Sequence, residues 1–289
     1  MKYFFPIITL FALTLTSCNK EIEFKGDIGE RQLVVNCIME NDSVIQVALS
    51  KSTPAIGEQN YGSNIITSSA TLVLLDETTG EIFTSSAVNA ENVYEFGTTA
   101  KEGHSYSISV SHSEFKTASA SSMIPTAVAI SDWDTSSYKM DGQTFKTLDI
   151  TLNDPSQDNY YIVTVSIIDT VFHNEYITYL TVNQSAGYDL EEGTSIFIKD
   201  DLFQNSTKKL SVEFTPKYYY DQSYLQIGEQ SYKINLYSVS KEAYLYLLSV
   251  TKSMNTEESP FSEPVRVFSN ITNGLGVFGG LAKNELIIE

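Results

Sequence analysis

Apolar and polar side chains alternate with a period of two along the chain after Arg31, as in β-strands that bury one face. Glycine and polar turn residues separate the runs, and Pro125 closes the series. Seven short strands in about 95 residues are typical of an immunoglobulin-like or transthyretin-like β-sandwich. The predicted strands cover residues 33–39, 44–49, 70–76, 81–86, 93–96, 106–110 and 115–123.

A tyrosine corner is the clearest local signal in this first unit. Gly103 opens a turn, Tyr106 follows three residues later, and Ile108 and Val110 then alternate with polar residues. In Greek-key sandwiches such a tyrosine fills the corner, and its hydroxyl bonds back to the main chain. We therefore expect the Tyr106 ring to be buried and its hydroxyl to contact the backbone upstream.

The second unit, residues 126–289, repeats the strand pattern but adds one helix. Ser240 can cap a helix over 240–254, with Tyr244, Leu247 and Leu248 on one face and an acidic residue in the first turn. The predicted fold class is mostly β: an N-terminal sandwich over 31–125, then a larger β-rich domain with this helix. The predicted strands cover residues 128–133, 144–152, 160–169, 176–182, 195–198, 209–214, 232–238 and 284–289.

The glycines at 274, 276 and 279 spell the dinucleotide fingerprint G-x-G-x-x-G. That fingerprint needs a βαβ unit of about 30 residues and an acidic residue about 20 positions downstream. The sequence ends at Glu289, so neither requirement is met. A glycine-rich turn or bulge is the interpretation that we adopt.

The N-terminus predicts an address at a membrane. Lys2 precedes an apolar run of about 13 residues, which is too short to span a hydrocarbon core of about 30 Å as a helix. The tetrapeptide that ends in Cys18, Leu-Thr-Ser-Cys, looks like a bacterial lipobox. We expect residues 1–17 to be a signal peptide, Cys18 to carry the lipid, and residues 18–30 to form a polar tether. Acyl chains contribute about 0.8 kcal/mol per buried CH₂ to anchorage.

Charge and cysteine content narrow the partners. The chain has 18 basic and 36 acidic residues, a net charge of −18, which argues against binding a nucleic-acid backbone. Only one other thiol, Cys37, exists, and it lies in an apolar run as a small buried residue would. Lys20 with the acidic residues beside it resembles the surface-export signal of Bacteroidota lipoproteins.

Several phrases resemble one family, the Bacteroidota lipoproteins that share the domain of unknown function 4249 (DUF4249). The similarity covers nearly all of the chain after the lipobox. Members of the family have no established activity and tend to be encoded beside TonB-dependent outer-membrane receptors, which implies an accessory role in the envelope. The phrases lie at 33–36, 154–155, 160–161, 199–203, 259–264 and 269–279.

The sequence contains few candidates for catalytic or metal-binding motifs. The histidines His104, His112 and His173 lie outside any zinc or nucleophile motif, so we predict no catalytic residue, no metal, no cofactor and no nucleotide. Acidic clusters at 132–134, 189–192 and 200–201 lack EF-hand spacing, although an irregular calcium shell stays open.

Aromatic and hydroxyl residues supply the candidate sites. Sugar faces could stack on Trp133 and on the run Tyr218, Tyr219 and Tyr220, with core or interface packing as the alternative. Two tripeptides resemble the Asp-Ser/Thr-aliphatic O-glycosylation motif of Bacteroidota envelope proteins, and their acceptors are Ser43 and Thr170.

Three functions follow as hypotheses. The first is a non-enzymatic, surface-exposed outer-membrane lipoprotein that assists a TonB-dependent β-barrel receptor. The second is direct binding of a glycan or a peptide by the aromatics of the second unit. The third is a hydrolase whose residues converge only in the fold.

Overall fold

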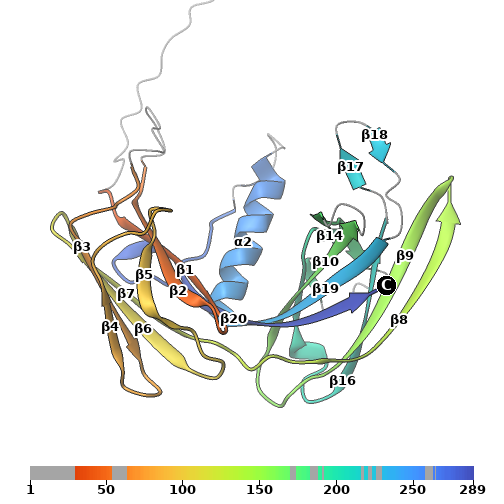
Figure 1. The fold of residues 1–289 in the computed structure, drawn as a ribbon, viewed down its shortest axis with the longest axis horizontal. Helices are drawn as coiled ribbons and strands as arrows, with labels where there is room; N and C mark the ends of the chain where they lie inside the picture. The colour runs from red at the N-terminus through yellow and green to blue at the C-terminus, as the bar shows by residue number, and fades with distance from the viewer. Residues whose placement is uncertain are drawn as a thin grey trace, which may run out of the picture. The chain divides into compact units, whose positions relative to one another are not determined.

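The computed structural model describes most of the chain after residue 29 as packed β-sheets (Figure 1). Among these residues the one α-helix is α2 (Lys241–Glu257), so the prediction of a mostly β protein with one helix is confirmed. Cys18, Thr170 and His173 lie outside the described residues. The described ranges are 30–53, 64–169, 174–182, 188–190, 192–215, 218–220, 223–225, 230–257, 263 and 265–289.

The first seven strands form two packed sheets, as the alternation predicts. One sheet contains the order β1-β2-β5 and the other the order β4-β3-β6-β7. Every second residue of β1 is buried, because successive side chains of a strand point to opposite faces. The strands are β1 (Leu33–Glu40), β2 (Val44–Lys51), β3 (Ala70–Asp76), β4 (Ile82–Ser85), β5 (Tyr94–Thr99), β6 (Ser105–His112) and β7 (Phe115–Met123).

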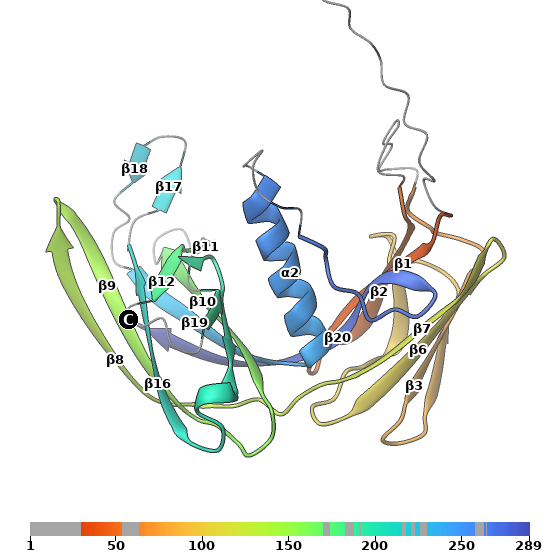
Figure 2. The ribbon, with the colours of Figure 1, turned by 180° about the vertical axis from the view of Figure 1, so that it is seen from behind.

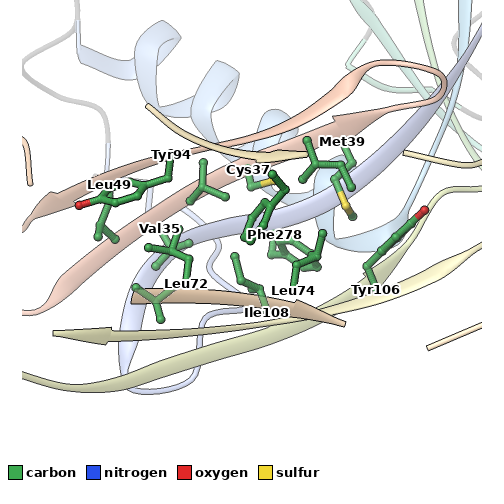
Figure 3. Packing of buried hydrophobic residues seen from close by; sticks show 14 of the residues in the cluster. Val35, Cys37, Met39, Leu49, Leu72, Leu74, Tyr94, Tyr106, Ile108 and Phe278 are labelled. Carbon is green, nitrogen blue, oxygen red and sulfur yellow. The ribbon is translucent and has the colours of Figure 1, made fainter. Parts of the chain in front are cut away.

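We call the hydrophobic cluster between these sheets the first core (Figure 3). It is rich in aromatic rings, with Tyr94, Phe96 and Tyr106 almost fully buried. Cys37 is also part of it, as the apolar run predicts, and Phe278 enters it from the last strand of the chain.

The remaining strands surround a second core. A five-stranded sheet of order β14-β12-β16-β9-β8 belongs to this part, and the other strands extend the large sheet through β13-β15-β10-β19-β20, with β11 paired to β10. Their bounds are β8 (Ile130–Met140), β9 (Gln143–Asn153), β10 (Tyr160–Asp169), β11 (Glu175–Ile177), β12 (Leu180–Val182), β13 (Tyr188–Leu190), β14 (Glu192–Gly193), β15 (Ile196–Lys199), β16 (Thr207–Phe214), β19 (Gln230–Val239) and β20 (Gly274–Ile288).

Several predicted strands have different bounds in the structure; the one expected over 284–289 is the end of the longer strand β20 (Gly274–Ile288). The strand expected over 128–133 runs on to Met140, where Asp141 and Gly142 turn it into β9 with positive φ angles of 50° and 76°. This two-residue turn is typical of a hairpin, and the polar composition of 134–143 hid it. The strand expected over 176–182 is two strands, β11 and β12, in different sheets.

The helix α2 begins where the sequence predicts and ends three residues later. The Ser240 hydroxyl accepts a hydrogen bond from the Ala243 N–H at 3.2 Å, which satisfies one of the free donors of the first turn. Tyr244 and Leu248 pack on the sheet against Tyr160 and Phe197. The buried face is therefore the face that the apolar spacing marked.

The glycine-rich segment near the C-terminus is a strand, so the prediction of a turn or bulge is wrong. Strand β20 pairs with β1 in parallel over Gly274–Leu281 and with β19 antiparallel over Leu281–Ile288 (Figure 2). At Gly276, which has a φ of +104°, a Cβ would lie 2.2 Å from the Val35 carbonyl oxygen. The glycines are needed for close backbone approach to neighbouring strands.

The same strand contributes side chains to both cores. Phe278 and Ala282 belong to the first core, and Ile288 belongs to the second. The division of the sequence at residue 125 stays a prediction.

Candidate functional site

The structure places Trp133 on β8, at the edge of the five-stranded sheet. Its partner across the hairpin is Ile150, which belongs to the second core, so the indole lies on the core-facing side of the sheet. The side chain is still 44 % exposed. Trp133 therefore lies at the edge of the sheet and is not packed inside the core. An exposed indole can stack on a ligand.

The Tyr218–Tyr220 run forms the short strand β17, which pairs with β18 (Ser223–Leu225). This ribbon is a separate two-stranded sheet. The side chains of the three tyrosines lie outside the described residues, so the run is placed by its backbone alone.

Ser43 lies in the turn between β1 and β2. The preceding residue, Asp42, has a left-handed φ of 61°, and the Ser43 N–H donates to the Glu40 carbonyl at 3.1 Å. The Ser43 side chain is exposed. A hydroxyl at an exposed turn is accessible to a modifying enzyme.

The tyrosine corner is confirmed. The Tyr106 hydroxyl accepts a hydrogen bond from the Lys101 N–H at 3.0 Å, and the ring is 1 % exposed. His104, in the same turn, contacts Asp76 with 2.8 Å between Nδ1 and Oδ2. Asp76 also accepts hydrogen bonds from the N–H groups of Thr78 and Thr79 at 2.9 and 3.2 Å. Both histidine and aspartate therefore hold the turn together.

The pKa of Asp76 reflects these contacts. Burial alone would raise the pKa of this carboxyl, but the hydrogen bonds from His104, Thr79 and Thr78 outweigh burial and hold the pKa below its usual range. The carboxylate form is the one that the folded turn needs. The other described histidine, His112, packs against Phe115 at the end of the β6–β7 hairpin.

A buried polar cluster that the chemistry of the sequence did not reveal joins three distant phrases. The Tyr161 hydroxyl donates to Asp154 Oδ1 at 2.5 Å, and the Asn205 N–H donates to Asp154 Oδ2 at 3.0 Å. Beside them the Asn159 N–H donates to Asp200 Oδ2 at 2.7 Å. The segments 154–155, 160–161 and 199–203 thus meet, and their resemblance to the DUF4249 family was the only sequence signal that pointed to these residues.

The titration of this cluster is shifted by its surroundings. Burial raises the pKa of Asp200, and the negative charge of Asp154 adds to the shift. Burial also raises the pKa of the Tyr161 hydroxyl, and its hydrogen bond to Asp154 adds to it. Asp154 and Asp200 contact backbone N–H groups and neighbouring side chains around the short 3₁₀ helix η2 (Asp200–Leu202). These contacts give the cluster a structural role, holding the connecting segments together.

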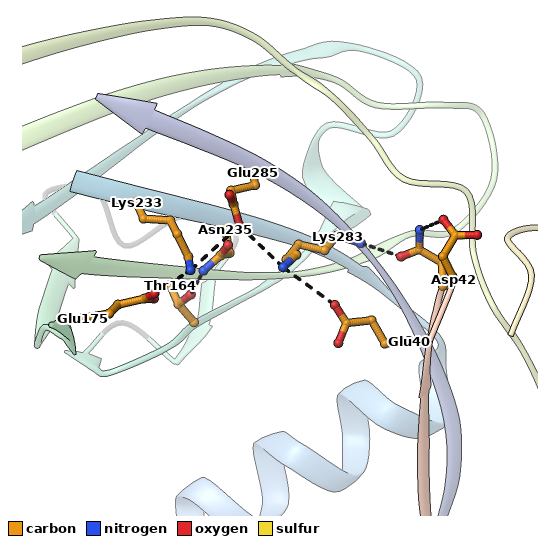
Figure 4. Close-up of polar contacts among 9 residues, drawn as sticks. Glu40, Asp42, Thr164, Glu175, Lys233, Asn235, Lys283 and Glu285 are labelled. Carbon is orange, nitrogen blue, oxygen red and sulfur yellow. Dashed lines mark hydrogen bonds and ion pairs between the residues drawn. The ribbon is translucent and has the colours of Figure 1, made fainter. Parts of the chain in front are cut away.

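A chain of ion pairs crosses the polar face of the large sheet (Figure 4). Lys233 contacts Glu175 at 2.6 Å and Glu285 at 3.9 Å between nitrogen and oxygen. Lys283 contacts Glu285 at 3.5 Å and Glu40 at 3.8 Å. These side chains come from four strands, β1, β11, β19 and β20, so the charges tie the strands together while nearly cancelling.

An open groove of about 670 Å³ lies between β7 and the start of α2. Across it the Ser122 hydroxyl donates to Glu242 Oε2 at 3.0 Å. Glu77, Ser121 and Glu242 also border an adjoining hollow over β3, β6 and β7. None of the described lining residues is among the candidate catalytic, ligand-binding or modification residues chosen from the sequence.

The acidic clusters do not gather into a metal site in the described part of the chain. No group of three or more His, Cys, Asp or Glu residues there has the geometry to hold an ion. Nor does any described helix combine the length and apolarity that crossing a bilayer would need.

Comparisons with known proteins give one assignment. No curated protein sequence matches this chain. Among solved structures, the BSP domain of a biofilm associated protein aligns over 94 % of this chain at 10 % identity, with a TM-score of 0.22. This chain covers 62 % of that domain.

Two further structures align over similar lengths. The MSCRAMM ACE of Enterococcus faecalis aligns at 8 % identity over 86 % of this chain and 94 % of its own, with a TM-score of 0.18. A chain from the structure of Gaeumannomyces graminis manganese lipoxygenase and Komagataella pastoris zonadhesin aligns at 11 % identity over 88 % and 93 %, with a TM-score of 0.16. Similarities at these TM-scores carry no argument about this chain.

One family model matches nearly the whole chain. It matches from residue 19, directly after Cys18, to residue 287, close to the end of β20. The helix, the buried cluster and every strand described above lie inside the match, except for Ile288, the last residue of β20. The chain belongs to the family defined by the domain of unknown function DUF4249.

Proposed function

We propose that this protein is a non-enzymatic lipoprotein of the bacterial cell envelope, anchored to the outer membrane through Cys18 and exposed at the cell surface. Its task is to bind or present something to a TonB-dependent β-barrel receptor. The observation that carries the proposal is the apolar run that ends in Leu15-Thr16-Ser17-Cys18. Membership of the DUF4249 family and an architecture of packed sheets with a long, exposed edge strand, β8, support a binding role.

The lipid anchor is tested first, by labelling cells with radioactive palmitate. We expect label in the wild-type protein, no label in Cys18→Ala, and accumulation of the precursor in the presence of globomycin. Cys37→Ala is the matched control, because Cys37 is 2 % exposed and burial raises the pKa of its thiol to about 12. Unchanged processing and an unlabelled wild type would contradict the anchor.

The receptor is tested by co-purification from detergent-solubilised membranes. We expect the tagged lipoprotein to bring down a β-barrel receptor, and the Cys18→Ala protein to lose it because the variant is no longer held at the membrane. Protease treatment of intact cells should also digest the wild-type protein. Repeated purification of the wild type without any barrel would overturn the proposed partner.

Glycan binding is a second candidate, which the exposure of Trp133 favours. A glycan array with the wild type, Trp133→Ala and a variant with Tyr218, Tyr219 and Tyr220 replaced by alanine tests it. Tyr179→Ala is the control, because Tyr179 is also an exposed aromatic residue and directly precedes β12, three strands from β8 in the sheet order. Signals that survive in both test variants would argue against these aromatics as the binding site.

Ser43 is a further proposal, as an O-glycosylation acceptor at the exposed β1–β2 turn. The mass of the intact mature protein should exceed the sequence mass by hexose units, and Ser43→Ala should remove part of that excess. A wild-type mass without added sugar would remove both Ser43 and Thr170 as acceptors.

A further inference from the structure

Strand β8 is an edge strand with an open side. It ends the sheet order β14-β12-β16-β9-β8, and in the described part of the chain its only strand partner is β9. Ten of its side chains, those of residues 131–140, are exposed. Such an edge presents backbone donors and acceptors to any extended segment that approaches it.

The outward donors of this edge are held by two aspartates. In an antiparallel pair, every second residue of an edge strand directs its N–H and C=O away from its partner. Trp133 and Thr135 are two residues apart, and each donates its N–H to the carboxylate of the preceding residue, Asp132 and Asp134, at 2.9 Å. The exposed carboxylates therefore stand in for the backbone of a neighbouring strand.

The charges at this edge favour one kind of occupant. Asp132 and Asp134 are both exposed. Lys209 on β16, two strands away, attracts both carboxylates electrostatically, but its ammonium group is already paired with Asp149 at 2.8 Å. A basic segment would meet two carboxylates and the half-exposed indole of Trp133, which attracts cations through its ring face. A second copy of the chain would bring a net charge of −18 to the same edge.

We propose that the outer edge of β8 is a strand-addition site for an extended, basic peptide segment of a partner protein. The carbonyl groups of the incoming strand take over the Trp133 and Thr135 N–H groups. The displaced Asp132 and Asp134 carboxylates then pair with lysine or arginine side chains of that strand. The exchange keeps every hydrogen bond and adds charge pairs, so acidic and neutral segments gain less from it.

The experiment uses the only tryptophan of the chain, Trp133, as its own reporter. A blocked peptide of alternating lysine and threonine is titrated into the full-length protein while the tryptophan fluorescence is followed. We expect a saturable change, at least tenfold weaker binding when glutamate replaces lysine, and a similar loss when all peptide nitrogens are methylated. Methylation keeps the charges and removes the backbone donors along both edges of the peptide strand, so equal binding of the methylated peptide would overturn strand addition.

Two variants test the site itself. Thr135→Pro removes one outward N–H while β8 keeps its ladder with β9, since proline is tolerated at such edge positions; we expect at least tenfold weaker binding and unchanged circular dichroism. The Asp132→Ala, Asp134→Ala double variant should lose the preference for lysine over glutamine peptides. A Glu91→Gln, Glu114→Gln control removes two exposed charges elsewhere and should bind as the wild type does.

Two further outcomes would overturn the proposal of a basic partner segment. A double variant that dimerises in sedimentation runs without peptide would assign the edge to a second copy and overturn the basic partner. Equal binding of lysine and glutamate peptides to the wild type would also overturn the basic partner. The proposal stands apart from the receptor test above, because co-purification of a barrel through another surface is compatible with either result here.

Discussion

Two regions of this protein use the same contact, an aspartate that accepts hydrogen bonds from backbone N–H groups, with opposite surroundings. Asp76 does so beneath the tyrosine corner at 4 % exposure, while Asp132 and Asp134 do so on the open edge of β8. A buried carboxylate without its partners is costly, so Asp76 is fixed in place. An exposed carboxylate exchanges one partner for another at little cost. The difference in burial separates a structural cap from one that can be released.

The same contrast holds for the strands that carry these residues. Strand β20, at the border of the first core, is packed so closely that Gly276 and Gly280 leave no room for a Cβ. Strand β8 has solvent on its outer side. Substitutions should therefore act on stability in the first region and on association in the second.

The largest effect is expected for Gly276→Ala. The added Cβ would lie 2.2 Å from the Val35 carbonyl oxygen at a φ of +104°, so β1 and β20 must separate. We expect a loss of more than about 4 kcal/mol in the free energy of unfolding, measured by urea denaturation. Gly97→Ala is the control, because no atom lies within 4 Å of its Cβ position. Similar stability of the two variants would show that the β1–β20 contact is looser than described.

Asp76→Ala should come next. It removes the acceptor for two backbone N–H groups and for His104 in a buried turn, which we expect to cost about 3 kcal/mol. The loss should depend on pH. Because the folded-state pKa of Asp76 is lowered, its contribution is complete above the unfolded value of about 3.9 and disappears as the pH falls through the folded value.

That pH dependence sharpens the comparison with the edge. The stability difference between wild type and Asp76→Ala, measured by denaturant titration from pH 7 downward, should narrow below about pH 4. A constant difference across this range would show that the ionised form of Asp76 is not what holds the turn.

Tyr106→Phe should have a smaller effect. The ring still fills the corner, but the Lys101 N–H loses its acceptor, so we expect a loss of about 1.5 kcal/mol. Thermal unfolding followed by circular dichroism measures it. Tyr138→Phe serves as the control, because its hydroxyl bond to Glu213 is exposed and should contribute less.

The smallest effect on stability is expected at the open edge. Asp132→Ala with Asp134→Ala should change the free energy of unfolding by less than about 0.5 kcal/mol, because water replaces the lost acceptors. The same denaturant titration applies. A loss comparable to that of Asp76→Ala would mean that the exposed caps hold β8 in place, and the contrast between the two regions would fail.

Local patterns gave a good part of the fold. The period-two alternation predicted β1 to β7, the four-residue phrase from Gly103 to Tyr106 predicted the corner, and Ser240 predicted the start of α2. Each of these features depends on residues close together in the chain, where backbone preference and burial act in the same direction. The long hairpin of β8 and β9 was missed, because its polar strand carries no alternation.

The candidate sites were less accessible to such reasoning. Trp133 could be singled out by its residue type, but its place at an open edge follows from the sheet order. The Asp154, Tyr161 and Asp200 cluster could not be assembled from sequence, because its members are brought together by the pairing of β10 with β15 and by the turn after η2.

By itself, the sequence determined the mostly β character, the helix, the tyrosine corner and membership of the DUF4249 family, and the proposed address depends on the N-terminal segment that ends in Cys18. Only the tertiary structure decided that the glycine-rich segment is a strand that contributes to two cores, and that Asp132 and Asp134 accept hydrogen bonds from backbone N–H groups at the free edge of β8. The physical reason is range. Strand formation follows from neighbours in the chain, whereas the choice of partner, as in β1 against β20, is made by backbones that lie more than two hundred residues apart.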